Sequence, residues 1–310
     1  MNALTHKLAD AFGFDGAIGT DVSVSFEFFP PKTEGMEKTL WSSIKRLEPL
    51  NPHFVSVTYG AGGTTRERTH KTVTRILDET SLTPASHLTC VGASKDEIDD
   101  IVRNYHAHGV RHIVALRGDP PEGQTRYAPH PHGYANGAEL TAGIKRVAPD
   151  IDVSVSCYPE RHPDSPDWDI ELDNLKRKVD AGASRAISQF FFDVPVYAEM
   201  VERVRRENID IPLVPGIIPV LNYKQVAKFA KMAGASIPPW LGELYDGLDQ
   251  DEETRKMVAA MVAADQVRKL YAMGVRDFHF YTLNRADLTY AICHILGIRQ
   301  DRQPGEEGQS

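Results

Sequence analysis

The sequence predicts an α/β protein that folds as a (β/α)8 barrel, a TIM barrel with extra helices. Eight short apolar or alternating runs recur along the 310 residues, and each is followed by a stretch with helical periodicity. Parallel strands need such crossovers, and eight of them match a closed barrel. The rival is a doubly wound nucleotide-binding sheet, which usually begins with a GxGxxG turn that this chain lacks.

The predicted elements alternate in chain order. The strands are expected at 22–29, 54–59, 86–91, 112–117, 153–158, 186–192, 213–218 and 277–282. The helices are expected at 34–47, 66–79, 95–106, 138–147, 169–181, 197–207, 223–232 and 252–273. Asp249 is the predicted N-terminal cap of the last helix. The segment 235–248 is predicted as an excursion before the eighth strand.

No break in composition divides the chain, so residues 22–299 are predicted to form one barrel domain. Residues 1–21 are predicted as an N-terminal extension and residues 300–310 as a flexible polar tail. A net charge of −8 argues against nucleic-acid and anionic-membrane binding. Three dispersed cysteines, no apolar leader and no long apolar run predict a cytoplasmic protein. Two His-x-His pairs lack further ligands at zinc spacing, so no metal is predicted.

Glu27 is the carboxylate in the aromatic run Ser25 to Pro31. Strand alternation places Ser25 and Glu27 on one face and Phe26 and Phe28 on the other. If the phenylalanines pack against the helix layer, Glu27 points into the barrel, where shielding from water suits a general acid. The alternative is an edge-strand glutamate that points at water.

Polar residues also end the other predicted strands, and active sites of barrels lie at this edge. Arg117 and Asp119 share a face across Gly118, which predicts either a local ion pair or two groups beside a bound ligand. Gln189 either bonds to neighbouring backbone or reads the edge of a heterocycle. The basic stretch 174–178 is either a solvated helix face or a phosphate site.

These residues resemble one family, the flavin-dependent methylenetetrahydrofolate reductases, in their short bacterial form. The resemblance runs from about residue 22 to residue 297. It rests on the motifs SFEFFPP at 25–31, VTYGA at 57–61, HLTC at 87–90, RHIVALRGD at 111–119, NLKRKVDAGA at 174–183, QFFFD at 189–193 and DFHFYTLNRA at 277–286.

The resemblance implies a barrel that binds FAD without a Rossmann motif. Reduced nicotinamide, NADH or NADPH, would reduce FAD and leave, and 5,10-methylenetetrahydrofolate would then be reduced to 5-methyltetrahydrofolate for methionine synthesis. It also implies a homo-oligomer. Two other functions stay open on the residues alone, a non-catalytic folate- or flavin-binding barrel and a metal-assisted barrel hydrolase.

The resemblance also implies roles for individual residues. Glu27 would protonate the folate as its five-membered ring opens, and Asp119 would lie near the flavin and tune it. The expected FAD-binding residues are Thr58, Tyr59, Ala61, His87, Arg117, Gly118, Asp119, Tyr134, Ala135, Tyr158, His162, Glu171, Asn174, Arg177 and Lys178. The expected substrate-binding residues are Thr58, Gln189, Gln225, Phe229, Tyr281 and Arg285.

Overall fold

The computed structural model describes residues 21–59, 66–120, 123 and 126–299. Three predictions lie outside these residues: most of the N-terminal extension, the cofactor contact of Ala61, and the C-terminal tail. Within the described ranges, no helix combines the length and the hydropathy needed to cross a membrane.

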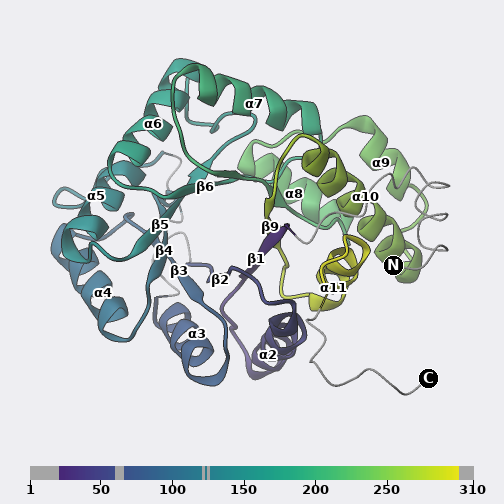
Figure 1. The fold of residues 1–310 in the computed structure, drawn as a ribbon, viewed down its shortest axis with the longest axis horizontal. Coiled ribbons are helices and arrows are strands. Elements are labelled where there is room, and N and C mark those ends of the chain that lie inside the picture. The colour runs from purple at the N-terminus through teal and green to yellow at the C-terminus, as the bar shows by residue number, and fades with distance from the viewer. Residues whose placement is uncertain (1–20, 60–65, 121–122, 124–125, 300–310) are drawn as a thin grey trace.

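The strands form one parallel sheet that curls into a barrel (Figure 1). In chain order they are β1 Ser23–Phe28, β2 Phe54–Val57, β3 Pro84–Thr89, β4 His112–Leu116, β5 Asp152–Cys157, β6 Arg185–Ser188, β7 Leu213–Val214, β8 Gly216–Ile217 and β9 Asp277–Tyr281. Each strand from β1 to β6 pairs with the next in the chain, and β9 pairs with both β1 and β8.

The two shortest strands, β7 and β8, are the halves of the single strand predicted at 213–218. Pro215 separates them, because proline has no N–H to give to a strand ladder. β7 pairs with β6 and β8 pairs with β9, and the Pro215 carbonyl still accepts the His279 N–H at 3.0 Å. The sheet therefore returns to its start, and the predicted eight-unit barrel is confirmed.

The helices surround the strands (Figure 1). They are α2 Glu34–Leu47, α3 Arg66–Glu79, α4 Lys95–Ala107, α5 Gly137–Val147, α6 Trp168–Asp180, α7 Val194–Arg206, α8 Tyr223–Ala233, α9 Pro239–Tyr245, α10 Glu252–Ala272 and α11 Ala286–Ile295. Eight of these match the predicted helices within three residues at each end. A 3-10 turn, Glu48–Leu50, follows α2.

Two helices were missed, and one predicted cap was wrong. Helix α11 packs against both α2 and α10, so its apolar residues cover more than one side and the helical period is weak. Helix α9 is a short helix inside the predicted excursion. The cap of α10 is Asp251, which accepts the Thr254 N–H at 2.9 Å, whereas Asp249 pairs with Lys224 at 2.7 Å.

The side chains of β1 point to two different layers, as its alternation predicted. Phe26 and Phe28 are fully buried in the main core between the strands and the helices. Glu27 faces the barrel interior. A separate cluster of Phe54, Ala85, Val114, Ile187 and Val214 fills the interior. Glu27 therefore lies above a packed layer of apolar side chains, and the barrel interior is not an open pore.

Candidate active site

A cavity of about 2610 Å³ opens at the carboxyl ends of the strands. Most of the predicted site residues line it: Glu27, Thr58, Tyr59, His87, Arg117, Gly118, Asp119, Ala135, Tyr158, His162, Glu171, Asn174, Lys178, Gln189, Gln225, Phe229, Tyr281 and Arg285. Segments more than 250 residues apart in the sequence thus meet at one site, because the parallel strands all end at the same edge.

Two of the predicted residues do not line the cavity. The Tyr134 side chain is buried, and its hydroxyl donates to Asp99 at 2.6 Å. Arg177 is exposed on α6 and pairs with Asp173 at 3.0 Å. The predicted cofactor contacts of Tyr134 and Arg177 stay predictions, since neither residue is among those that line the cavity.

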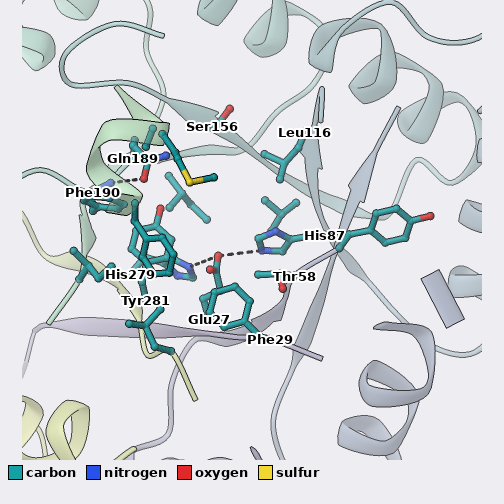
Figure 2. A pocket seen from close by; sticks show the side chains of 18 of the residues that line it. Glu27, Phe29, Thr58, His87, Leu116, Ser156, Gln189, Phe190, His279 and Tyr281 are labelled. Carbon is teal, nitrogen blue, oxygen red and sulfur yellow. Dashed lines mark hydrogen bonds and ion pairs between the residues drawn. The ribbon is translucent and has the colours of Figure 1, made fainter. Parts of the chain in front are cut away.

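Glu27 lies at the centre of the site between two histidines (Figure 2). Its Oε2 atom is 3.4 Å from Nε2 of His87 and 3.8 Å from Nε2 of His279. All three side chains are buried. The contact with His87 is close, but it lacks hydrogen-bond geometry, so Nε2 of His87 has no hydrogen-bond partner among the residues that the structure describes. Burial lowers the pKa of His87 to about 4, although the Glu27 carboxylate opposes this shift. His87 is therefore neutral at pH 7.

His279 and Ser25 are site residues that the sequence reasoning missed. Nδ1 of His279 lies 2.7 Å from Oγ of Ser25. The ring is also stacked on Phe54, with 5.7 Å between ring centroids. Strand alternation could have found this contact, because His279 and Tyr281 share a face of β9 as Ser25 and Glu27 share a face of β1. The parallel register sets Ser25 beside His279 and Glu27 beside Tyr281.

Gln189 and Tyr281 form the wall of the cavity next to Glu27 (Figure 2). Gln189 follows β6 directly, and its Oε1 atom accepts the N–H of Phe190 at 3.0 Å. The predicted bond to neighbouring backbone thus engages the amide oxygen. The Tyr281 hydroxyl donates to the Ser188 carbonyl at 2.7 Å, and burial raises the pKa of Tyr281 well above its usual value. Tyr281 is therefore a neutral, fixed side chain.

Helices α8 and α11 supply the remaining predicted substrate residues. Gln225 and Phe229 are four residues apart on α8, so they share the helix face that lines the cavity. Phe229 is half-buried and Gln225 is exposed at the rim. Arg285 stands exposed at the start of α11. This side of the cavity offers an apolar ring flanked by polar groups, which suits an aromatic ligand with a polar end.

The basic helix α6 divides into two faces. Glu171, Asn174 and Lys178 line the cavity at helical spacing, whereas Lys176 and Arg177 form exposed pairs with Asp180 and Asp173. The solvated-face interpretation therefore holds for Lys176 and Arg177 alone. Nζ of Lys178 donates to the Ser156 carbonyl at 2.8 Å, and burial lowers the pKa of Lys178.

Glu171 is buried and fixes the loop that follows β5. Its Oε2 atom accepts the backbone N–H of His162 at 3.2 Å and the hydroxyl of Ser165 at 2.5 Å. The His162 ring packs edge-on against Tyr158, with 4.7 Å between centroids. Glu171 is thus a loop-fixing residue whose carboxylate also faces Lys178.

Arg117 does not pair with Asp119. Nη2 of Arg117 donates to Oδ2 of Asp164, at 2.8 Å, in the loop after β5. Asp119 is exposed and lines the cavity, and no described cation lies within ion-pair distance of it. Gly118 between them has φ +87°, and a Cβ there would lie 2.6 Å from Cγ1 of Val91. Only glycine fits at this turn.

The predicted histidine pairs have other contacts. His106 hydrogen-bonds Asp150 at 2.8 Å, and Nδ1 of His130 accepts the N–H of His132 at 3.2 Å. Over the described ranges, no group of three or more histidine, cysteine, aspartate or glutamate side chains has the arrangement of a metal site.

Comparison with known proteins decides the family. Residues 17–297 match the protein family described as "Methylenetetrahydrofolate reductase". The chain belongs to the methylenetetrahydrofolate reductase family. The 5,10-methylenetetrahydrofolate reductase of Escherichia coli is 52% identical over 298 residues, 96% of each chain. The enzyme of the same name from Buchnera aphidicola of Acyrthosiphon pisum is 44% identical, over 91% of this chain and 94% of the relative.

One more distant relative and one solved structure of similar fold extend the comparison. The Arabidopsis thaliana protein "Methylenetetrahydrofolate reductase (NADH) 1" is 33% identical over 88% of this chain, which covers 48% of that protein. A solved structure from Clostridium thermocellum, described as binding two copies of 5-methyl-5,6,7,8-tetrahydrofolic acid, shares the fold with a TM-score of 0.59 at 14% identity. The alignment covers 89% of this chain and 95% of that one.

Proposed function

We propose that this chain reduces 5,10-methylenetetrahydrofolate to 5-methyltetrahydrofolate with FAD as cofactor and NADH or NADPH as electron donor. The observation that carries the proposal is the buried Glu27 carboxyl in a cavity that Gln189 and Phe229 also line. Family membership supports the reaction, since close relatives carry the name of this reductase.

The residues of the cavity fit a flavin that carries a diphosphate. Lys178 is a cation beside the first residue of α5, since a Cβ on Gly137 would lie 3.5 Å from Cε of Lys178. Arg117 adds a second cation on the cavity wall. Helix N-termini and basic side chains together favour phosphate groups. We infer that Lys178, Asn174, Arg117 and the start of α5 would hold the anionic part of FAD.

The roles of the protein side chains follow from their surroundings. Bound FAD would accept a hydride from the nicotinamide and give one to the folate. Glu27 would donate the proton that opens the five-membered folate ring, because it is a buried carboxyl group at the end of β1, whereas the buried Glu171 carboxylate already binds its own loop. Neutral His87 lies beside its Oε2 atom without adding a positive charge near an arriving cationic intermediate, and the His279 ring lies on the other side. Gln189 would orient the nicotinamide and the pterin in turn.

The exposed carboxylate of Asp119 would complement this acid. It lines the same cavity. A negative charge stabilises a nearby cation, so Asp119 would favour the positively charged folate intermediate and would tune the redox potential of the flavin. Glu27 would thus supply a proton, whereas Asp119 would supply a charge.

Stopped-flow spectroscopy of the purified full chain tests the proposal. With FAD bound, the protein should show the visible absorption band of oxidised flavin. NADH or NADPH should bleach that band, and 5,10-methylenetetrahydrofolate should restore it. Running each nicotinamide separately also decides the electron donor. The proposal is wrong if the chain cannot be loaded with FAD, or if the folate does not reoxidise the reduced flavin.

A further inference from the structure

Arg117 is held in the cavity by contacts from two different loops. Its Nη2 atom donates to Asp164 Oδ2 at 2.8 Å, and its guanidinium carbon lies 4.5 Å from the centre of the Tyr127 ring. Its Nε atom donates to the Gly118 carbonyl at 3.2 Å. Arg117, Tyr127 and Asp164 all line the cavity. The carboxylate of Asp164 therefore binds the Arg117 guanidinium, the same cation that an anionic ligand of this cavity would bind.

The Asp164 side chain is not needed to shape its own loop. Glu171 fixes the loop through the His162 N–H and the Ser165 hydroxyl. The Asp164 contribution to the loop is its backbone N–H, which donates to Nδ1 of His162 at 2.9 Å. The carboxylate is 57% exposed, so it can turn into solvent without disturbing buried groups. Arg117 likewise keeps its contacts with Gly118 and Tyr127 when Asp164 leaves.

A carboxylate and a phosphate use the same guanidinium geometry, because each accepts two N–H bonds from the planar fork. We propose that Asp164 competes with the cofactor's phosphates for Arg117 and so limits how tightly the site holds an anionic flavin. This inference rests on the proposed function, since it assumes that FAD is the cofactor. It makes Asp164 a determinant of the affinity for phosphate-bearing ligands.

Binding measurements on the full chain stripped of flavin test this competition. Asp164→Asn keeps the size of the side chain and removes its charge. We expect FAD to bind roughly threefold to tenfold more tightly, because a partly exposed ion pair of this kind is weak. Riboflavin, which has no phosphate, should bind the variant and the wild type equally. The gain for FAD should shrink in high salt.

Asp169→Asn is the matched control. Asp169 is an exposed residue of the first turn of α6 that does not line the cavity, and its replacement changes the net charge by the same amount. Its FAD dissociation constant should equal that of the wild type. The inference is overturned if Asp164→Asn binds FAD no more tightly than the wild type, if riboflavin gains as much as FAD, or if Asp169→Asn reproduces the gain.

Inorganic pyrophosphate separates this inference from the proposed function. Isothermal titration with pyrophosphate alone needs no flavin, and Asp164→Asn should bind it more tightly than the wild type by a similar factor. If the wild type binds no flavin, the proposed function fails, while the pyrophosphate comparison still decides whether Asp164 competes for Arg117. Equal pyrophosphate affinities in the two proteins would overturn the competition.

Discussion

Ser25 and His279 are register partners on the adjacent strands β1 and β9, and Oγ of Ser25 lies 2.7 Å from Nδ1 of His279. With Nδ1 engaged, the ring directs its other nitrogen toward Glu27, 3.8 Å from Oε2. The stacked Phe54 ring limits rotation from the side. One hydrogen bond therefore sets which imidazole nitrogen faces the buried carboxyl group.

Ser25→Ala removes that hydrogen bond. A lost hydrogen bond of about 1 kcal/mol corresponds to roughly a fivefold effect, so folate reduction should slow by about that factor while flavin reduction by nicotinamide is unchanged. Stopped-flow measurement of each half-reaction checks this. Ser56→Ala is the control, because the Ser56 hydroxyl is buried and no described residue forms a hydrogen bond with it. Equal slowing in both variants would contradict a role for the Ser25 contact.

Glu27→Gln keeps the shape of the side chain but removes its acidic proton. The folate half-reaction should fall by roughly a hundredfold to ten-thousandfold, the usual contribution of a general acid. Reduction of the flavin by nicotinamide needs no acid from the protein and should survive, which makes it the internal control. A similar loss in both half-reactions would mean that Glu27 holds the site together and does not donate the proton.

Gly118→Ala should destabilise the protein by steric collision. The new Cβ would lie 2.6 Å from Cγ1 of Val91, and overpacking of this kind costs about 1–3 kcal/mol beyond the strain of positive φ. Gly247→Ala is the control, since Gly247 has φ +75° with no atom within 4 Å of the added Cβ. Urea unfolding should show a larger loss of free energy of unfolding for Gly118→Ala. If both variants lose the same free energy of unfolding, backbone strain alone explains the effect and the collision with Val91 contributes nothing.

His112 should make the stability of the protein depend on pH. It is buried, with Nε2 2.7 Å from Oγ of Ser154, and burial lowers its pKa against the opposing field of Asp152. The unfolded chain, with a histidine pKa of about 6.5, binds a proton there before the folded protein does. The contribution of His112 is therefore complete above about pH 6.5 and declines as the pH falls below it, by up to about 1.4 kcal/mol per pH unit.

The variant His112→Gln checks this contribution. Urea unfolding between pH 7 and pH 5 should show a shallower loss of stability for the variant than for the wild type. His132→Gln is the control, because His132 is exposed, and its pH dependence should match that of the wild type. An unchanged slope in His112→Gln would show that other groups cause the pH dependence.

Much of the fold was predictable because it depends on local periodicity. Eight alternations of strand and helix predicted the barrel, and the alternation of β1 alone predicted that Glu27 faces inward while Phe26 and Phe28 face the helices. Helix α11 was not predicted, because its packing on two sides weakens the periodic spacing of its apolar residues. The break between β7 and β8 at Pro215 was not predicted, because the flanking residues have the pattern of one continuous strand.

The sequence by itself determined the fold, the family and the residues available for chemistry, since periodicity and motifs are properties of the chain. Only the tertiary structure decided which side chains meet. It paired Arg117 with Asp164 instead of Asp119, set His279 beside Glu27, and turned Lys178 but not Arg177 toward the cavity. The physical reason is that these contacts depend on sheet register and helix rotation, which bring together residues tens to hundreds of positions apart and leave no local signal.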